Sequence, residues 1–377
     1  MKILAIDTSC DETAAAVTRG TTVLSNVIWS QASEHARFGG VMPSLAKRMH
    51  EERIDFVIEK ALRQAQCGWT DVDAVAVTTG PGLAIALEVG IRKAKEIARE
   101  LKEPLIPVNH IEGHVLSPLA QPLNSKYWRS QRFSSKIQNS NQIQKSKSQV
   151  TNVSFPAVGL VVSGGHTELI LIKNIGKYEI LARTQDDALG EALDKAARIL
   201  GLGYPGGAIL EKMAREGNPK AFLLPLPMAR RKDSNSFSYS GLKTALFRLV
   251  ASLRLSQSLS RQQIHDLAAS FQNRAFEHLV RVMGKVLRAQ CSVLKINDLL
   301  VGGGVAANIE LRKRLRKLGK ELGLKMRLPY SAKLVGDNAA MIGVAAGLRV
   351  KAGCPVLVTH YEEVDRRPRW IVEEEFK

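Results

Sequence analysis

The sequence repeats one local plan, in which an apolar strand leads into a polar turn and a second apolar strand follows. The two turns are residues 7–13 and 163–167. Short apolar runs bounded by polar or glycine-containing segments are typical of β-strands. An internal duplication of one folding unit is therefore predicted. The strands expected in the two copies are residues 2–6, 14–18 and about 22–28, then residues 157–162, 169–172 and 178–181.

Helical patterns follow each copy of this unit. Apolar residues recur with helical spacing near 45–66 and 91–101 in the first half, and near 190–200 in the second. Strands that alternate with helices are typical of α/β layers. A chain of 377 residues also exceeds the size at which one hydrophobic core usually continues to grow. We therefore expect an α/β fold with two lobes.

A segment of different composition separates the two halves. Residues 124–152 are rich in Ser, Asn, Gln and Lys and contain no acidic residue. Their six Lys and Arg residues account for +6 of the net charge of +18, so the rest of the chain still carries about +12. We interpret residues 122–152 as a basic, low-complexity insertion that forms a solvated, flexible loop, with contact to RNA as the alternative.

Charge and cysteine content narrow the class of protein. A net charge of +18 and an isoelectric point near 9.9 favour an anionic partner such as nucleic acid. No apolar run approaches the roughly 18 residues of a membrane-spanning helix, and the N-terminal run reaches Asp7 too early for a signal peptide. The four scattered cysteines contain no Cys-x-x-Cys pair, which fits reduced thiols. We expect a cytoplasmic protein with no membrane partner.

A metal site is suggested by His110 and His114. Two imidazoles four residues apart on a helix lie on one face and can reach one cation. A zinc protease needs a glutamate directly after the first histidine, but Ile111 occupies that position and Glu112 lies on the opposite side of the helix. A histidine pair that only packs or is solvated is the alternative to metal binding.

Three glycine-rich turns follow apolar strands, at residues 163–166, 204–207 and 302–308. The last precedes a helix expected from about Asn308, which suits an adenosine or phosphate group held by backbone amides at a helix N-terminus. A single turn of this kind is often only a connection, but three in a duplicated α/β chain favour nucleotide binding. Neither a Walker A motif nor a Gly-x-Gly-x-x-Gly motif after the first strand is present.

Acidic residues supply further candidate ligands. Asp187, Glu191 and Asp194 are spaced to lie on one helical face, as a carboxylate wall for ribose or amine groups or as a solvated acidic surface. Asp337 stands before a small apolar run at 339–347. We expect it to be either a third metal ligand or the cap of the following helix.

Ordered motifs extend along nearly the whole chain, at residues 6–13, 39–46, 80–83, 108–114, 162–167, 237–244, 302–308, 336–338 and 368–370. Together they resemble the TsaD family of tRNA threonylcarbamoyl transferases, formerly described as O-sialoglycoprotein endopeptidases. The resemblance implies the duplicated actin, sugar-kinase and heat-shock-ATPase-like fold, with two lobes around a nucleotide cleft. The expected parts are an N-terminal lobe at 1–121, the insertion at 122–152, a C-terminal lobe at 153–333 and a segment at 334–377 that returns to the N-terminal lobe.

The resemblance also implies the residues of the site. His110, His114 and Asp337 would hold one divalent metal ion, iron or zinc. Two positions depart from the family pattern, since Ser44 stands where many relatives have a glutamate and Asn109 where some have a second histidine. Neither is an expected metal ligand. The adenylated substrate would lie along Val161, Val162, Ser163, Gly164, Gly165, Asp194, Gly207, Glu211 and Asn308.

The activity implied by the resemblance is transfer of a threonylcarbamoyl group from threonylcarbamoyl-AMP to N6 of the adenosine 3′ of the anticodon, in tRNAs that read ANN codons, with release of AMP. An exocyclic amine is a weak nucleophile, so Asp11 or Glu12 is expected to act as a general base. Expected partners are tRNA, a paralogous TsaB-like subunit and a small TsaE-like ATPase. The alternative functions are a metalloprotease, a non-catalytic nucleotide-binding regulator and a small-molecule kinase.

Overall fold

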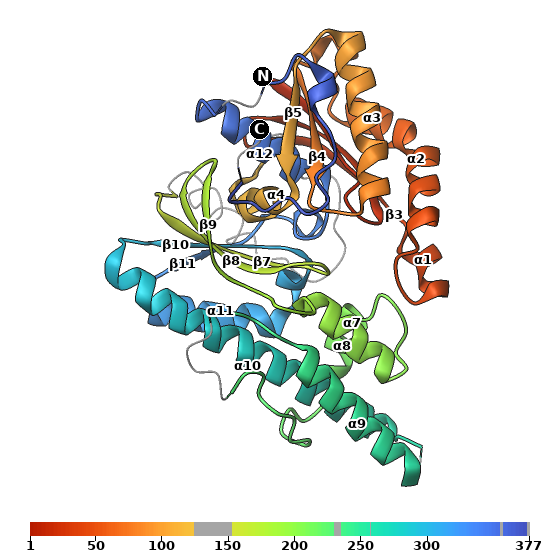
Figure 1. The fold of residues 1–377 in the computed structure, drawn as a ribbon, viewed down its shortest axis with the longest axis vertical. Coiled ribbons are helices and arrows are strands. Elements are labelled where there is room, and N and C mark those ends of the chain that lie inside the picture. The colour runs from red at the N-terminus through yellow and green to blue at the C-terminus, as the bar shows by residue number, and fades with distance from the viewer. Residues whose placement is uncertain (124–152, 230–234, 257, 355–356, 375–377) are drawn as a thin grey trace.

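Two β-sheets, each flanked by helices, make up the architecture of the chain (Figure 1). The computed structural model describes residues 1–123, 153–229, 235–256, 258–354 and 357–374. Of the insertion predicted at 122–152, residues 124–152 lie outside the described residues. Within the described ranges, no helix is long and apolar enough to cross a membrane.

The first sheet has six strands in the order β5-β4-β1-β2-β3-β6. Its centre is a meander, since β1 pairs antiparallel with β2 and β2 pairs antiparallel with β3. Strand β4 adds parallel to β1, and β5 adds parallel to β4. The strands are β1 (Lys2–Asp7), β2 (Glu12–Arg19), β3 (Thr22–Ser30), β4 (Ala74–Gly80), β5 (Leu105–Asn109) and β6 (Gln121–Pro122).

The second sheet repeats this topology with five strands in the order β11-β10-β7-β8-β9. The meander β7-β8-β9 corresponds to β1-β2-β3, and the parallel strands β10 and β11 correspond to β4 and β5. The duplication predicted from the sequence is therefore confirmed. The strands are β7 (Ala157–Val162), β8 (Thr167–Asn174), β9 (Lys177–Arg183), β10 (Asp298–Gly302) and β11 (Lys325–Arg327).

Helices form the layers on either side of the sheets. The first sheet packs against α2 and α3 on one face and α12 on the other, α4 lies between α12 and the second sheet, and the remaining long helices cover the far face of the second sheet (Figure 1). The α-helices are α1 (Ala32–His35), α2 (Pro43–Gln64), α3 (Ala84–Leu101), α4 (His110–Leu116), α7 (Leu189–Ile199), α8 (Gly207–Ala214), α9 (Ser240–Ser256), α10 (Arg261–Val293), α11 (Ile309–Glu321) and α12 (Ala339–Lys351). The 3₁₀ turns are η1 (Ala36–Phe38), η2 (Trp69–Asp71), η3 (Ser117–Leu119), η4 (Gly304–Ala307), η5 (Ala332–Leu334) and η6 (Tyr361–Glu363).

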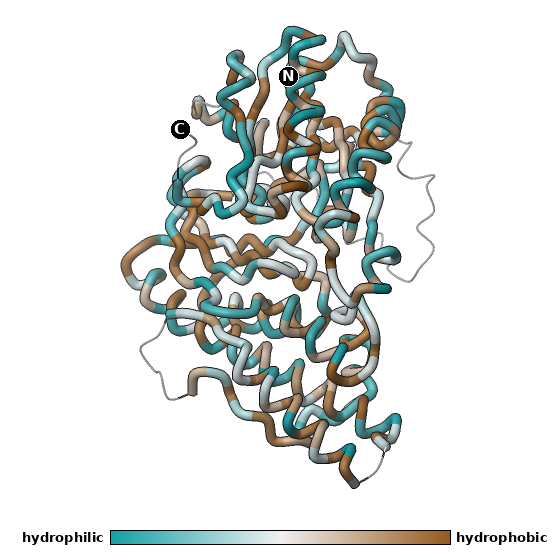
Figure 2. The backbone as a smooth tube through the Cα atoms, turned by 45° about the vertical axis from the view of Figure 1, so that its right-hand side comes forward, coloured by the Kyte–Doolittle hydropathy of each residue, from teal (hydrophilic) through white to brown (hydrophobic). Residues whose placement is uncertain are grey.

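The alternation of side chains along the strands explains this layering. In β1, Leu4 and Ile6 enter the core beneath α2 and α3, whereas Ile3 and Ala5 enter the core shared with α4 and α12. Successive side chains of a strand point to opposite faces, so one buried strand supplies both cores. Figure 2 shows the same pattern, with hydrophobic residues gathered in the strands and hydrophilic residues interspersed along the outer helices. The core that contains α4 and α12 joins residues of both sheets, so it fixes one lobe to the other.

Two sequence expectations about helices need correction. Helix α3 begins at Ala84 and not near residue 91, because the segment after Gly82 is already helical. Asp187 does not share a helical face with Glu191 and Asp194, because α7 begins only at Leu189.

Candidate functional site

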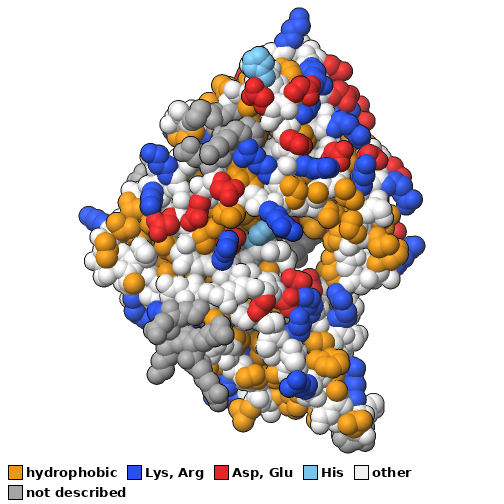
Figure 3. Space-filling model, in the orientation of Figure 1, with side chains coloured by type: hydrophobic (Ala, Val, Ile, Leu, Met, Phe, Trp, Pro, Cys, Tyr) orange, Lys and Arg blue, Asp and Glu red, His pale blue; other side chains and the backbone are white. Residues whose placement is uncertain are grey.

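A cavity of about 730 Å³ lies where the two lobes meet. The first lobe contributes the turn between β1 and β2, and the second contributes the loop after β7 and the turn before α8. On the face shown in Figure 3, the surface is indented between the upper and lower parts of the molecule. The two copies of the strand-turn-strand unit therefore present their polar turns to the same cavity.

His110 lines this cavity and His114 lies buried beside it, because of where α4 begins. The side chain of Asn109 accepts hydrogen bonds from the backbone N–H groups of Ile111 (2.8 Å) and Glu112 (3.3 Å), so it caps the helix and makes His110 its first residue. His114 follows one turn later. The two rings lie 4.6 Å apart between centroids and are nearly perpendicular, at 82°.

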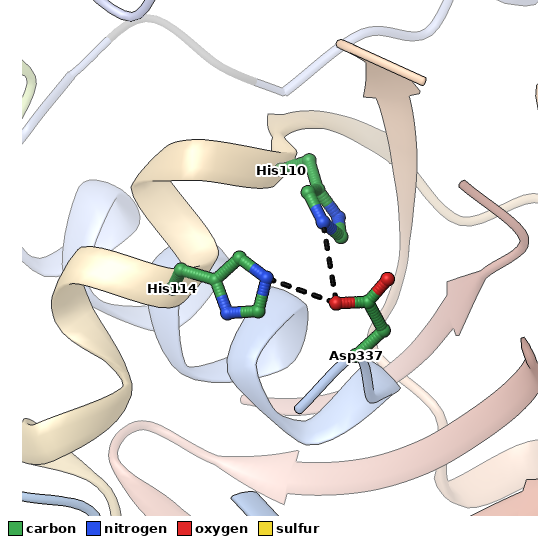
Figure 4. A group of neighbouring side chains, drawn as sticks. All are labelled: His110, His114 and Asp337. Atoms are coloured by element: carbon green, nitrogen blue, oxygen red, sulfur yellow. Dashed lines mark hydrogen bonds and ion pairs between the residues drawn. The ribbon is translucent and has the colours of Figure 1, made fainter. Parts of the chain in front are cut away.

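Asp337 meets both histidines from a distant part of the chain. Its Oδ1 lies 3.0 Å from Nε2 of His114 and 3.6 Å from Nε2 of His110, and Figure 4 shows both rings directed at this carboxylate. The cap of α12 is the next residue, since the Asn338 side chain accepts from the backbone N–H of Met341 at 3.0 Å. Of the two roles expected for Asp337, the geometry therefore favours the ligand and assigns the cap to Asn338.

The donor set of this cluster fits a divalent transition metal. Ligands about 2.1 Å from a tetrahedral ion lie roughly 3.4 Å from one another, close to the observed 3.0 and 3.6 Å, and the ligand atoms of His110, His114 and Asp337 all fall within 4.8 Å. Imidazole nitrogen with carboxylate oxygen suits zinc and iron. Within the described part of the chain, Nδ1 of each histidine and Oδ2 of Asp7 are buried without a hydrogen-bond partner.

The charges of the cluster stabilise one another. Burial alone would lower the pKa of His110, but the Asp337 and Asp7 carboxylates raise it to about 10. The pKa of Asp337 lies well below its usual range, because the two histidines outweigh its burial. Burial and the neighbouring charge of His110 lower the pKa of His114, and the same two causes lower that of His166 to about 3. In the metal-free site, the Asp337 and Asp7 carboxylates thus favour the protonated form of His110, whereas burial disfavours the protonated forms of His114 and His166.

Further carboxylates lie where the turn after β1 enters β2. The pKa of Glu12 is raised well above its usual range, first by burial and then by the negative charges of Asp11 and Asp337. Burial and the same carboxylates also raise the pKa of the Cys10 thiol, which excludes a thiolate nucleophile here. Cys10, Asp11 and Glu12 all line the cavity. The structure thus brings Asp11 and Glu12 into the same cavity as His110 and Asp337.

The glycine-rich loops of the second lobe form the opposite wall. Ser163 closes its loop with two hydrogen bonds to His166, from Ser163 N to His166 O (2.9 Å) and from His166 N to Ser163 Oγ (3.1 Å). Oδ1 of Asp194 accepts from the backbone N–H groups of Gly206 (2.8 Å) and Gly207 (2.7 Å), which ties α7 to the start of α8. Burial raises the pKa of Asp194 despite these bonds.

The remaining predicted substrate residues divide into two groups. Glu211 and Asn308 line the cavity, and Glu211 accepts from the backbone N–H of Ile309 at 3.0 Å. The Asn308 side chain caps α11 and donates to Gln272 at 2.9 Å. Val161 and Val162 differ, since their side chains enter two hydrophobic cores and do not line the cavity. Of the predicted substrate residues, those that line the cavity are Ser163, Gly164, Gly165, Asp194, Gly207, Glu211 and Asn308.

Two residues near His110 were not predicted as site residues. Asp7 lies 3.7 Å from Nδ1 of His110, and the ring of His166 lies 6.3 Å from that of His110. Asp7 directly follows the predicted strand at 2–6, and His166 lies in the polar turn after the predicted strand at 157–162, so their place in the two polar turns was an available signal. Asp187 does not join the wall expected with Glu191 and Asp194, and instead pairs with Lys195 and Lys243.

The sequence matches the family model TsaD, described as tRNA N6-adenosine threonylcarbamoyltransferase, over residues 22–127 and 140–344. The chain is 42% identical over 371 residues to the protein of that name from Syntrophotalea carbinolica, covering 98% of this chain and 96% of the relative. It is 43% identical over 356 residues to the one from Trichlorobacter lovleyi, covering 94% of this chain and 93% of the relative.

Solved structures show the same fold at low sequence identity. HypF from T. kodakarensis has a TM-score of 0.57 at 14% identity, covering 94% of this chain and 48% of HypF. Full-length HypF in the phosphate- and nucleotide-bound form has a TM-score of 0.52 at 12% identity, covering 93% of this chain and 55% of HypF. The fold and site define a two-lobed protein of the duplicated actin and sugar-kinase class, as predicted, with a histidine and aspartate cluster in its interlobe cavity. Within that class, the chain belongs to the TsaD family of tRNA N6-adenosine threonylcarbamoyltransferases.

Proposed function

We propose that this protein transfers the threonylcarbamoyl group from threonylcarbamoyl-AMP to N6 of the adenosine 3′ of the anticodon, in tRNAs that read ANN codons. The observation that carries the proposal is the shared cavity, which is lined both by His110 and Asp337 of the histidine and aspartate cluster and by the glycine-rich loops of the second lobe. The near full-length similarity to tRNA N6-adenosine threonylcarbamoyltransferases supports it.

The reaction exchanges one bond to the carbamoyl carbon for another. The N6 amine attacks the carbonyl carbon, an N–C bond forms, and the C–O bond to the phosphate breaks, so AMP leaves and the amine loses one proton. The AMP part is proposed to lie along Val161 to Gly165, Asp194, Gly207, Glu211 and Asn308, with Val161 and Val162 contributing backbone only. Backbone amides of such loops can bind a phosphate without a side chain between them and the ligand.

Glu12 is the better of the two candidate bases for the proton of N6. Burial and the nearby Asp11 and Asp337 carboxylates raise its pKa, so its carboxylate is a stronger base than that of an ordinary glutamate. Asp11 is proposed to act beside it, as the neighbour whose negative charge raises that pKa.

His110, His114 and Asp337 would hold one divalent ion, iron or zinc, which supplies a Lewis acid for the threonyl carboxylate or the carbamoyl carbonyl. The residues themselves contribute a preformed anchor. Asn109 fixes the start of α4, and Asn338 fixes the start of α12, so the three ligands are held on two capped helix ends.

The net charge of +18 is proposed to guide tRNA to the cavity. Lys195 and Arg198 line its wall on α7 and are placed to meet a phosphate backbone. A TsaB-like subunit and a small TsaE-like ATPase are the proposed protein partners, and the cytoplasm is the proposed compartment, where tRNA is available.

The rival functions fit the geometry less well. A metalloprotease needs a base beside the metal-bound water, but the Glu112 carboxylate is turned toward Tyr178 and Arg349. A non-catalytic regulator or a small-molecule kinase would not require the histidine and aspartate cluster.

The deciding experiment is nucleoside mass spectrometry of tRNA from cells depleted of the protein. Depletion should remove the threonylcarbamoylated adenosine, the wild-type protein should restore it, and His110→Ala should not. Unchanged levels of the modified nucleoside after depletion would refute the proposal. Proteolysis by purified protein that His110→Ala abolishes would favour the metalloprotease instead.

A further inference from the structure

Glu112 is a buried carboxylate in the middle of the two-histidine helix, and the proposed reaction does not use it. Its side chain is only 2% exposed, although it lies two residues from each histidine. Oε1 accepts a hydrogen bond from the Tyr178 hydroxyl at 2.7 Å, and Oε2 lies 3.5 Å from Nη1 of Arg349. We call Glu112, Tyr178 and Arg349 the Glu112 cluster.

The three members of the Glu112 cluster come from three different layers of the fold. Glu112 belongs to α4, Arg349 to α12 on the first sheet, and Tyr178 to β9 of the second sheet. The Tyr178 hydroxyl is itself fixed, because it accepts from the backbone N–H of Gly176 at 3.3 Å. The cluster therefore connects α4 to both lobes.

Close packing of α4 on α12 makes this connection important for the metal ligands. A Cβ at Gly113 would stand 2.9 Å from Cδ1 of Ile342 and 3.1 Å from Cγ of Met341, so the helices touch at this glycine. His110 and His114 belong to α4, whereas Asp337 lies just before the start of α12. Any slide or rotation of α4 against α12 would change the distances between the histidine nitrogens and the carboxylate.

The cluster is also expensive to bury, which argues for a specific role. A carboxylate without water must be paired and hydrogen-bonded, and well-packed apolar residues are often at least as stabilising as a buried ion pair. A helix of seven residues gains little stability from its own hydrogen bonds, so its position depends on tertiary contacts. Directional bonds to Glu112 fix the rotation of α4, whereas apolar packing alone leaves it less defined.

We propose that the Glu112 cluster is a positioning device that locks the two-histidine helix to both lobes and thereby sets the metal affinity of the site. The inference rests on the proposed metal site, since it concerns how well His110, His114 and Asp337 are held for an ion. Glu112 is thus a positioning residue, with no contact to substrate or ligand required.

The test measures zinc affinity directly, by competition of the purified protein with a chromophoric chelator, and thermal unfolding of the metal-free protein alongside. Glu112→Gln keeps the shape but removes the charge, and Tyr178→Phe removes one hydroxyl. Loss of groups that orient metal ligands weakens metal binding by about 10- to 100-fold. We expect about tenfold for Glu112→Gln and a smaller loss for Tyr178→Phe.

A matched control comes from the second lobe. Asp298 and Arg327 form a buried ion pair, with Nε of Arg327 2.8 Å from Oδ1 of Asp298, and neither residue lines the cavity. Asp298→Asn should destabilise the protein in the same way as Glu112→Gln while leaving zinc affinity unchanged. An equal loss of zinc affinity in Asp298→Asn would overturn the proposal, because general loosening would then explain it.

The outcomes separate this inference from the metal site itself. Wild-type zinc affinity in both Glu112→Gln and Tyr178→Phe would overturn the positioning role while the site stands. Zinc binding that survives in His110→Ala would instead overturn the metal site and the inference with it. If Glu112→Gln does not fold, Tyr178→Phe decides alone, since loss of a single hydroxyl leaves the packing of the ring in place.

Discussion

Gly190 is a position at which a single added methyl group would disturb the Ser163 loop that is proposed to bind AMP. It is the second residue of α7, and its backbone N–H donates to the carbonyl oxygen of Ser163 at 3.2 Å. A Cβ added here would stand 2.4 Å from that oxygen and 2.8 Å from the Ser163 carbonyl carbon. Both are backbone atoms, so no flexible side chain can move aside.

The magnitude follows from two opposing effects. Overpacking a well-filled interior costs about 1–3 kcal/mol, whereas replacing glycine by alanine inside a helix gains about 0.5–1 kcal/mol. We expect Gly190→Ala to lower the free energy of unfolding by about 1–2 kcal/mol. The carbonyl of Ser163 must also move away by roughly 1 Å, and a shift of that size in a catalytic site costs about 100-fold in rate.

The assay compares Gly190→Ala with Gly241→Ala. Gly241 is likewise the second residue of its helix, α9, but nothing lies within 4 Å of its added Cβ. The gain in helix propensity is therefore common to both variants, and their difference isolates the contact with Ser163. Urea unfolding gives the stability, and AMP binding and threonylcarbamoyl transfer give the function. If Gly190→Ala unfolds, binds AMP and turns over like Gly241→Ala, the reasoning from this contact is refuted.

Three further predictions concern the glycine turn before α8, stability at low pH and tRNA binding. Asp194→Asn should weaken AMP binding by about fivefold to tenfold, because a charged acceptor forms hydrogen bonds with the Gly206 and Gly207 N–H groups that are about 1 kcal/mol stronger than those of a neutral one. Calorimetry with AMP measures the affinity. An affinity equal to that of the wild type would contradict the prediction. Burial and the charge of Arg281 lower the pKa of His278 to about 4. Between pH 6.5 and 4, His278 is therefore protonated in the unfolded chain but neutral in the folded protein. The contribution of neutral His278 to the free energy of unfolding is therefore complete above pH 6.5 and is lost as the pH falls, by about 3 kcal/mol in total. In His278→Gln, the free energy of unfolding measured in urea should fall by about 3 kcal/mol less than in the wild type over this pH range. An equal fall in both proteins would show the reasoning to be wrong. Binding of tRNA should weaken about 1,000-fold or more between 50 and 200 mM salt if six or more phosphates are contacted, and filter binding that shows a salt-independent affinity would count against the electrostatic role of the +18 charge.

Much of the fold could be predicted because its signals are local. Strand β7 was expected at residues 157–162 and has those bounds, and α7 was expected one residue later than it begins. Alternation of apolar residues encodes a strand, and helical spacing encodes a helix, wherever each lies in the chain. The start of α3 was missed because its first turns follow a glycine and proline segment that reads as a loop.

The sequence predicted individual features of the site better than the contacts between residues that are distant in the chain. The spacing of His110 and His114 predicted that both rings face one side of a helix, and Asn109 caps that helix as its residue type allows. Asp187 shows the limit, because its spacing suggested a shared face with Glu191, but two lysines hold it before the helix begins. The spacing of charged residues along the chain does not predict which ion-pair partner a side chain will have.

The sequence by itself determined the duplication, the polar turns at the strand ends and the histidine pair, since each depends on residues that are neighbours along the chain. Only the tertiary structure decided that Asp337, 223 residues after His114, completes the cluster and leaves the helix cap to Asn338. It likewise decided that Glu112 bonds to Tyr178 and Arg349. The physical reason is that helices α4 and α12 meet only when both sheets pack around them, and no local pattern records which side chains that packing brings together.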